Sequence, residues 1–370
     1  MPNSHPKYKV REGDTIPIIT ERFGVKEIVW INYHNNECRM FHEIGKKIPN
    51  RVKEIYLLPE LWEKADALNA MPNTKEIEGK RIDQRIEFGF ENTLPMKACY
   101  EPLHYGVMLA LFNDEKVNTI KYEISVRWIG KEDKNHYIEI NKISDTCIND
   151  QEPDLMFDIL AVKAASALYP LQLIVTSSDG IVGINNVADI QKRWENTKQE
   201  IRKYYSSDVL EKYLRLNDKT LQSEETLLRS LRNDWFLHAY FNRIYQPYGR
   251  EYSFTNHILA PFVFDSNGVE YTIQQTINPI IDEQGFVKIE MKGEFSDERS
   301  LIDLESGLNY PQYESANKPE GNYYAQYLIK SQHHTIDTLM IDCSLSLNNS
   351  KKTFIVISRI NKQESWVKKR

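Results

Sequence analysis

The chain has 370 residues, of which 41% are hydrophobic and 27% are charged, and its formal net charge is −6. This length predicts two or three domains, and the composition is that of an ordinary globular protein. The net charge gives no overall attraction for nucleic acid, and no stretch approaches the roughly 18 consecutive apolar residues of a membrane-spanning helix. We therefore expect neither nucleic-acid binding nor membrane insertion.

The N-terminus and the cysteines favour a cytoplasmic protein. Residues 1–7 lack the charged start, the apolar stretch and the cleavage site of an export signal. The four cysteines, Cys38, Cys99, Cys147 and Cys343, form no close pair of the kind that zinc ribbons and redox motifs need. We expect them to be reduced structural thiols in a cytoplasmic chain.

Residues 8–60 begin with a strand and a tight turn. The strand is predicted over 8–11, and the turn over 12–15. Aspartate and threonine are common helix N-caps, so Asp14 or Thr15 is expected to cap the helix that follows.

Two short helices are predicted next. The first covers 16–23, and Gly24 ends it because glycine adopts the left-handed conformation at little cost. The second covers 26–33 and is expected to turn Ile28 and Ile31 inward. A strand over residues 55–58 completes the order strand, helix, helix, strand.

This order and its residues resemble the LysM family. The family consensus has a tyrosine and an aliphatic strand, a Gly-Asp-Thr turn, a helix that ends in aromatic-Gly-Val, a second helix, and a last strand that stops at proline. The matching residues are Tyr8, Val10, Gly13, Asp14, Thr15, Ile19, Phe23, Gly24, Val25, Ile28, Ile31, Asn32, Leu57, Leu58 and Pro59. The resemblance implies a small βααβ module over residues 8–60.

The resemblance also implies where a ligand would bind. LysM modules that bind N-acetylglucosamine polymers hold the sugar between the loop after the first strand and the loop before the last. The corresponding residues here are Gly13, Asp14, Thr15, Ile16, Ile48 and Asn50. They are the candidate glycan contacts of this chain.

The second loop departs from the family pattern. A short Pro-Gly-Gln loop is usual, whereas this chain carries a longer insert over residues 37–53. The insert contains Arg39, Met40, Phe41 and Ile44, and such side chains suit a protein interface better than a sugar. We expect these four residues to contact a protein partner. The alternative is that Phe41 and Ile44 fold under the insert and complete the core of the module.

The rest of the chain is predicted to be a connector, over 61–95, and one large α+β domain, over 96–370. In the large domain, strands are expected over about 96–145, helices over about 154–249 and a strand meander over about 250–360.

The individual elements of the large domain follow from local patterns. The clearest predicted strands are 122–129, 137–141, 171–175, 181–184, 271–277, 286–294, 323–330, 338–347 and 353–359. A helix is predicted over 154–168, and three more are expected to be capped by Asn186, Asp208 and Asp218, the last of them running to Pro247. The predicted fold class is α+β: a LysM-like module joined to an open or half-barrel antiparallel sheet packed on central helices.

The sequence contains none of the common motifs for catalysis. The sequence has no phosphate-binding loop, no dinucleotide fingerprint, no nucleophile elbow and no His-Glu-x-x-His zinc helix. We therefore predict no catalytic residue, no metal site and no cofactor, and a protein that is not an enzyme.

Three functions are open at this point. LysM-like modules also occur in contractile injection machinery, including type VI secretion, where they act as adaptors between proteins. The first hypothesis is such an adaptor of a spike, baseplate or effector, with a component of the secretion apparatus or an effector as partner, and with delivery from the cytoplasm by the apparatus. The second is a protein that binds peptidoglycan or another N-acetylglucosamine glycan. The third is a wall-acting hydrolase or toxin, with its activity in residues 90–370.

Overall fold

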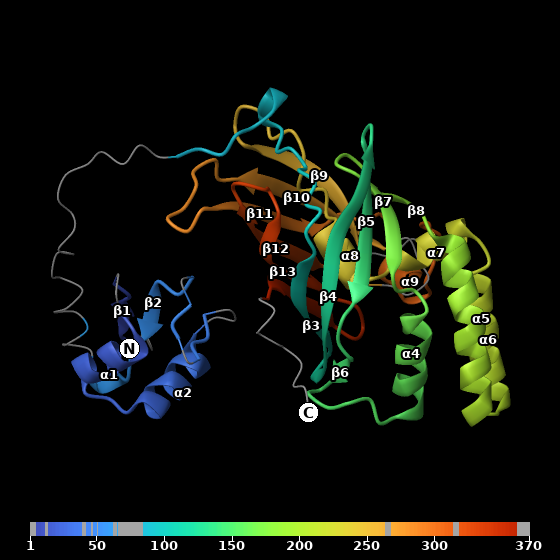
Figure 1. The fold of residues 1–370 in the computed structure, drawn as a ribbon, viewed down its shortest axis with the longest axis horizontal. Coiled ribbons are helices and arrows are strands. Elements are labelled where there is room, and N and C mark those ends of the chain that lie inside the picture. The colour runs from blue at the N-terminus through green and yellow to red at the C-terminus, as the bar shows by residue number, and fades with distance from the viewer. Residues whose placement is uncertain are drawn as a thin grey trace. The chain divides into compact units, whose positions relative to one another are not determined.

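The computed structural model describes residues 5–11, 14–38, 42–45, 47–49, 51–61, 65, 84–262, 268–313 and 318–360. The chain divides into two compact units, residues 1–82 and 83–370. Each unit has a hydrophobic core of its own. Figure 1 shows the helices and strands of both units, coloured along the chain.

The first unit is built on two helices and a two-stranded sheet. Its elements are β1 (Lys7–Lys9), α1 (Ile16–Phe23), α2 (Glu27–Glu37), β2 (Glu54–Tyr56) and a 3-10 turn at Pro59–Leu61. The strands are antiparallel, with Tyr8 opposite Ile55. The strand, helix, helix, strand order expected from the sequence is therefore present.

The core of this unit lies between the helices and the small sheet. Its buried apolar side chains are Tyr8, Ile16, Ile19, Phe23, Trp30, Ile44, Val52, Ile55, Leu57 and Ala65. Trp30 is completely buried, and its indole nitrogen donates a hydrogen bond to the Tyr56 carbonyl at 3.1 Å. This bond ties α2 to β2.

The prediction that Ile28 points inward was wrong. Helix α2 buries Trp30 and His34, which are four residues apart and so share one face. Ile28 is two residues before Trp30, about 200° around the helix at 100° per residue. Its exposed fraction is 71%. Ile31 is half-buried against the core, as expected.

Gly24 ends α1 as predicted. Its φ is 71°, and its N–H donates to the carbonyls of Thr20 and Glu21. A side chain at this angle meets the steric cost of the left-handed region, which glycine avoids.

We expect Gly24→Leu to lower the free energy of unfolding of the first unit by about 1–2 kcal/mol, because leucine rarely adopts a positive φ. Gly24→Asn should cost less, since asparagine tolerates this conformation. Urea unfolding of the fragment 1–82, followed by circular dichroism, measures both. Equal stability of Gly24→Leu and the unmodified fragment would contradict the C-cap.

The second unit contains a large antiparallel sheet. The strands found among the described residues are β3 (Leu103–Asn113), β4 (Lys116–Glu132), β5 (Asn135–Lys142), β6 (Cys147–Ile148), β7 (Leu171–Thr176), β8 (Gly180–Ile184), β9 (Ser253–Ala260), β10 (Val269–Ile277), β11 (Phe286–Phe295), β12 (Gly321–Lys330), β13 (Ile336–Leu345) and β14 (Lys351–Arg359). Their order is β8-β7-β5-β4-β3-β14-β13-β12-β11-β10-β9, and β6 pairs with β4. The sheet does not close, so β8 and β9 are its edges.

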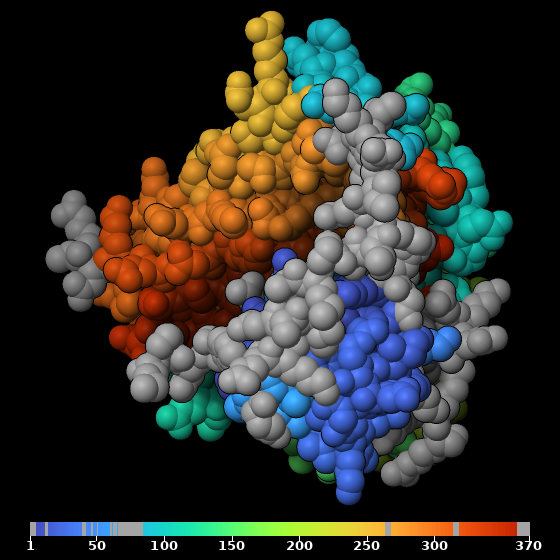
Figure 2. Space-filling view, turned by 90° about the vertical axis from the view of Figure 1, so that its left-hand side faces the viewer, coloured from blue at the N-terminus to red at the C-terminus, as the bar shows by residue number. Residues whose placement is uncertain are grey.

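The two halves of the sheet meet at its centre. From β3 to β8 the chain adds strands outward in one direction, and from β9 to β14 it returns strand by strand from the other edge. In the space-filling view the strands of this second half follow one another as bands from yellow to red (Figure 2). Strand β14 then pairs with β3, with Val107 opposite Ile357.

Helices connect and cover the sheet. They are α4 (Met156–Ser166), α5 (Val187–Tyr204), α6 (Asp208–Thr220), α7 (Glu224–Leu231), α8 (Trp235–Tyr240) and the short α9 (Leu301–Glu305). A 3-10 turn at Phe90–Asn92 precedes the first strand. Helices α5 to α8 link edge strand β8 to edge strand β9, and α8 packs against β13 and β14. None of the helices in the described part of the chain is long and apolar enough to cross a membrane.

Tyrosines of the sheet hold the end of α8. Tyr327 donates its hydroxyl hydrogen to the Ala239 carbonyl at 2.9 Å, and the Asn242 amide donates to the hydroxyl oxygens of Tyr323 at 2.8 Å and Tyr327 at 3.0 Å. Burial raises the pKa of Tyr323 and Tyr327 above its ordinary value. These hydroxyls therefore stay protonated and supply the hydrogen bonds that a buried helix end requires.

Both edges of the sheet are capped by polar side chains. On β8, the Ile184 N–H donates to the Glu224 carboxylate at 2.8 Å. On β9, the Arg243 guanidinium donates to the His257 carbonyl at 2.7 Å. Such contacts occupy backbone groups that another strand would otherwise pair with.

The structure confirms the antiparallel, unclosed sheet and the mixed fold class. Each strand predicted in the large domain lies within an observed one, except that the prediction over 338–347 runs two residues past the end of β13 at Leu345. The long helix predicted from Asp218 was wrong. Helix α6 runs to Thr220, and two shorter helices follow, capped by Ser223 and Asp234. Polar residues with strong N-cap preference interrupt the apolar pattern and start each new helix.

Two other cap predictions were also wrong. Ser207, one residue before Asp208, caps α6 by accepting a bond from the Leu210 N–H. Asn186 precedes α5, but its side chain bonds to Gln172 and Pro170 instead of capping the helix.

Part of the predicted connector packs with the large unit. The N–H of Ile86 donates to the Pro279 carbonyl at 3.0 Å, and that of Leu94 donates to the Gln246 carbonyl at 3.1 Å. Residues 62–64 and 66–83 lie outside the described residues.

Candidate functional site

The first loop of the small unit is organised by the Asp14 carboxylate. It accepts hydrogen bonds from the Tyr8 hydroxyl and the Arg11 N–H, both at 2.8 Å, and it pairs with the Arg22 guanidinium at 2.8 Å. Arg22 also donates to the Tyr8 hydroxyl. Strand β1, the loop and helix α1 thus meet at one carboxylate, whose side chain is only 2% exposed.

This network changes the role of the predicted loop residues. Asp14 faces the module, so the prediction that it caps α1 was wrong, and Thr15, which stands at the N-cap position, makes no side-chain cap bond. Ile16 is buried and Gly13 lies outside the described residues. Burial, and then the bond to Asp14, raises the pKa of Tyr8 to about 12. The Asp14 carboxylate is therefore engaged within the protein, whereas Thr15 is exposed.

The insert before β2 is anchored by Asn35. The Ile44 N–H donates to the Asn35 side-chain oxygen at 2.8 Å, and the Asn35 amide donates to the Ile44 carbonyl at 2.9 Å. The Ile44 side chain is buried in the core, which excludes its predicted contact with a partner and confirms the alternative for this residue. Ile48 is half-buried against the same core. Arg39, Met40, Phe41 and Asn50 lie outside the described residues.

His34 joins α2 to β2 and to the insert. The Tyr56 N–H donates to its Nδ1 at 2.9 Å, so Nε2 carries the hydrogen and donates to the His42 carbonyl at 2.7 Å. The ring is completely buried, and this burial lowers the pKa of His34 below its ordinary value. A second proton would have to go on Nδ1, where it would face a backbone donor.

The stability of the small unit should therefore depend on pH through His34. Because its folded pKa is lowered, the unfolded chain takes up the proton first, and stability falls as the pH drops below about 6.5. We expect the urea midpoint of fragment 1–82 to decrease between pH 7.5 and pH 5. His34→Gln, which does not titrate, should show a smaller decrease. Identical pH profiles would show that His34 takes up its proton equally in the folded and unfolded states, and would contradict the prediction.

The helices of the small unit also present apolar side chains outward. Ile18 on α1, and Ile28 and Val29 in the first turn of α2, are exposed. Single exposed aliphatic residues are common, but two consecutive ones in one helical turn form a small apolar surface. This surface was not predicted from the sequence, because Ile28 was expected to lie in the core.

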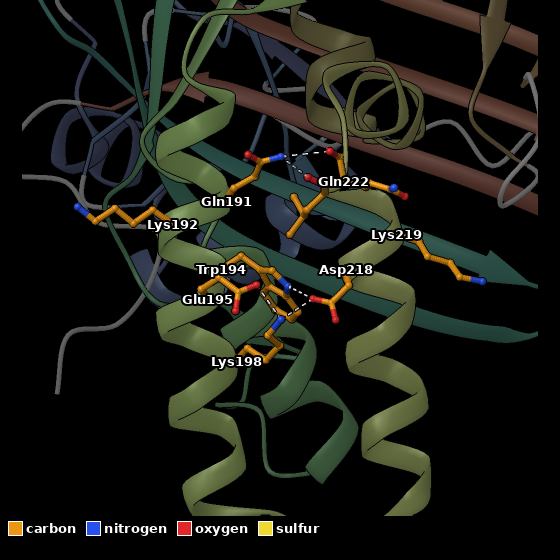
Figure 3. Close-up of a pocket in the computed structure, with 9 residues that line it drawn as sticks. Gln191, Lys192, Trp194, Glu195, Lys198, Asp218, Lys219 and Gln222 are labelled. Atoms are coloured by element: carbon orange, nitrogen blue, oxygen red, sulfur yellow. Dashed lines mark hydrogen bonds and ion pairs between the residues drawn. The ribbon is translucent and has the colours of Figure 1, made fainter.

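A second candidate site is a groove in the large unit, between α5 and the end of α6 (Figure 3). Its volume is about 500 Å³. It is lined by Gln191, Lys192, Trp194, Glu195, Lys198, Asp218, Lys219, Leu221 and Gln222.

The groove is crossed by one network centred on Asp218. The carboxylate accepts from the Trp194 indole nitrogen at 2.7 Å and from the Lys198 ammonium at 2.8 Å, and Lys198 also pairs with Glu195 at 2.7 Å. Gln191 donates from α5 to the Leu221 carbonyl at 2.8 Å. These bonds join the two helices, as the dashed lines of Figure 3 show.

The hydrogen bonds within the groove keep Lys198 and Asp218 charged. Burial works against the charge of Lys198, but the hydrogen bonds to Asp218 and Glu195 outweigh it and raise the pKa of the ammonium. Burial likewise opposes the charge of Asp218, but the bonds from Lys198 and Trp194 lower the pKa of its carboxyl. Neither group is tuned toward neutral pH, as a general acid or base would be. The network therefore holds α5 against the end of α6.

We expect Asp218→Ala to lower the free energy of unfolding of the full chain by about 1–3 kcal/mol, because the buried Trp194 N–H loses its acceptor. Glu195→Ala is the matched control. Its carboxylate pairs with the same lysine but is 57% exposed, so the loss should stay below about 1 kcal/mol. Urea unfolding monitored by tryptophan fluorescence measures both. Equal losses would show that the indole bond is unimportant.

Neither the Asp14 network nor the Asp218 network was predicted from the sequence. Trp194 and Lys198 are four residues apart on α5, a spacing that places them on one face. Their partner Asp218 was instead assigned to a helix cap, and no local pattern marks it otherwise. Among the described residues, no group of three or more His, Cys, Asp or Glu side chains could hold a metal ion.

Comparison with known proteins gives little further information. No protein family and no curated protein matches the chain. Among solved structures, one match is a domain assigned as an outer membrane lipoprotein-sorting protein from Vibrio parahaemolyticus, with 8% identity, a TM-score of 0.21, and coverage of 73% of this chain and 90% of that one. Another is a DUF1329 family protein from Desulfovibrio piger, with 9% identity, a TM-score of 0.21, and coverage of 72% and 88%. At these TM-scores the matches support no argument.

Proposed function

We propose that this protein is a non-enzymatic adaptor whose LysM-like N-terminal module binds a protein partner. The partner class is a component of a contractile injection or type VI secretion apparatus, such as a spike or baseplate protein, or an effector that the apparatus carries. The resemblance to LysM modules supports this context, since modules of that kind link proteins in such machinery.

The observation that carries the proposal is the contrast between the loops and the helices of the module. In the first loop, the Asp14 carboxylate already accepts hydrogen bonds from Tyr8 and Arg11 and pairs with Arg22. A sugar is bound through polar groups, and this carboxylate is not free to supply one. The helices, in contrast, present the exposed pair Ile28 and Val29. Apolar surface of this kind favours contact with another protein.

Burial of Ile44 shifts the expected partner surface from the insert to the helices. Residue Ile44 completes the core, so it cannot contact a partner without unfolding the module. Ile28 and Val29 lie at the start of α2 and leave that core intact when changed. We propose that Ile28 and Val29 contact the protein partner.

The test is affinity purification of the full chain from its native bacterium, with mass spectrometry of the bound proteins. We expect tube, spike, baseplate or effector proteins to be enriched, and the enrichment to fall at least tenfold for the double variant Ile28→Asp, Val29→Asp. Leu216→Asp is the matched control, because Leu216 is an exposed aliphatic residue on α6 of the large unit. Enrichment that is equal in both variants would contradict the proposed surface.

The alternative function is binding of peptidoglycan or another N-acetylglucosamine glycan. Calorimetric titration of the full chain with a chitin hexamer separates the two. We expect no binding in the micromolar range. Micromolar binding that is lost on changing the exposed Thr15 would establish the glycan function and overturn the adaptor proposal.

A further inference from the structure

The start of helix α4 carries three consecutive exposed apolar side chains. Leu155 precedes the helix, and Met156 and Phe157 are its first two residues. Their exposed fractions are 64%, 53% and 65%. Single exposed apolar residues are common, but three in a row form an apolar surface. We call Leu155, Met156 and Phe157 the α4 patch.

The α4 patch is the uncovered end of an apolar stripe. Eight of the eleven residues of α4 are apolar. Phe157, Leu160 and Ala164 are spaced by three and four residues, so they lie on one face of the helix. Leu160 and Ala164 are buried in the core of the large unit, whereas Phe157 is exposed. The stripe therefore extends beyond the side chains that cover it.

The other end of α4 is fixed to α5, which runs beside it (Figure 1). The Arg193 guanidinium of α5 donates to the Ala167 and Pro170 carbonyls, both at 2.9 Å. A cation at this end of a helix also complements the helix dipole. Nearer the middle of α4, the Lys163 ammonium lies 5.4 Å from the centre of the Tyr204 ring of α5. The α4 patch is therefore presented by a helix that is already held in place.

Leu155 stands where a capping residue would stabilise the helix. The N-cap position favours serine, threonine, aspartate and asparagine, whose side chains accept a hydrogen bond from the first turn. Leu155 occupies this position and makes no such bond, although Asp154 lies one residue earlier. Neither the missing cap nor the exposed leucine stabilises the folded chain. Such departures from local preferences are expected where a residue serves a function.

Acidic residues flank the α4 patch. Residues 143–162 include five aspartate or glutamate residues and no lysine or arginine. Asp150 pairs with Lys121 at 2.5 Å, but Glu152, Asp154 and Asp158 form no salt bridge within the part of the chain that the structure describes. These three lie within three residues of the α4 patch along the chain. The potential around the α4 patch is therefore negative.

This charge decides which partner fits the α4 patch. A second copy of the chain would bring the same carboxylates together in a two-fold contact, and like charges disfavour such an interface. An anionic lipid surface would be repelled for the same reason. A protein segment with one apolar side and with lysine or arginine beside it would cover the apolar residues and complement the carboxylates.

We infer that the α4 patch is a docking surface for a basic amphipathic helix of another protein. The apolar side of that helix covers Met156 and Phe157 and extends the cover of the α4 stripe, as in other complexes of amphipathic helices. Its cations pair with Glu152 and Asp154. This contact is separate from the one proposed for Ile28 and Val29, and it does not depend on it.

The test is fluorescence anisotropy of a labelled synthetic helix of leucine and lysine, with the leucines on one side, titrated with the full chain at physiological ionic strength. We expect binding that weakens about tenfold in the double variant Met156→Ser, Phe157→Ser, because the apolar contact is lost. Phe90→Ser is the matched control and should leave the affinity unchanged, since Phe90 is 85% exposed outside the α4 patch.

A second pair of variants tests the charges. Glu152→Lys with Asp154→Lys should also weaken binding about tenfold and should reduce its dependence on salt. The control is Glu225→Lys with Glu251→Lys, which makes the same change in net charge at exposed carboxylates of α7 and of the turn before β9. Binding to this control should weaken much less. Circular dichroism checks that each variant remains folded.

Four results would overturn the inference. The first is no binding of the peptide to the unmodified chain, and the second is equal affinity for that chain and for the Met156→Ser, Phe157→Ser variant. The third is equally tight binding of a peptide that carries serine in place of each leucine, because charge alone would then explain the contact. The fourth is a concentration-dependent dimer, seen by analytical ultracentrifugation, that the Met156→Ser, Phe157→Ser variant abolishes. That result would assign the α4 patch to a second copy of the chain.

Discussion

The large unit depends on the burial of a short helix inside a curved sheet. The end of α8 exposes carbonyl groups that must be hydrogen-bonded where water is excluded. Tyr327 bonds the Ala239 carbonyl, and Asn242 links Tyr323 to Tyr327. Tyr240 of the helix in turn donates to Tyr105 of β3 at 3.2 Å, and Tyr105 donates to the Ile336 carbonyl at 2.7 Å. The helix and strands from both halves of the sheet are thereby held in one register.

The first unit also depends on hydrogen bonds made by buried polar side chains. Ten buried apolar side chains among the described residues of this unit form a small core, and the buried side chains of Asp14 and His34 beside it have hydrogen-bond partners. Asp14 gathers donors from β1, the loop and α1, while His34 bridges β2 and the insert. His34 thereby joins segments up to 22 residues apart, and Asp14 fixes the loop between β1 and α1, so each contributes specificity as well as stability.

Local patterns predicted most elements but not the contacts that position them. Strand 286–294 was visible because its alternation is typical of a half-buried strand, and strand 353–359 because it is rich in β-forming residues. Strand β3 was not singled out, since Gly106, Met108 and Ala110 occupy the positions where alternation would place polar residues. Helix boundaries after Asp218 were missed because caps at Ser223 and Asp234 compete with a continuous apolar stripe.

The candidate sites show the same limit. The positions of Gly24 and of the loop residues followed from turn chemistry, which is local. The burial of Ile44 and the bond between Asp218 and Trp194 depend on residues in other elements, and the inward turn of Asp14 depends on Tyr8 and Arg22 on the two sides of its loop. A single sequence does not specify which polar side chains contact one another in the folded protein.

The pairing of β3 with β14 has a consequence for the synthesis of the chain. More than half of the polypeptide lies between these two strands, so β3 leaves the ribosome long before its central partner exists. Until then, one side of β3 is an open edge, and edges of this kind recruit other strands. Pairing between such distant strands also slows folding, because a long loop must close first. The nascent protein therefore passes through a stage in which strands β3 to β8 have been synthesised and strands β9 to β14 have not. Chaperone binding at the open edge of β3 would be most useful at that stage.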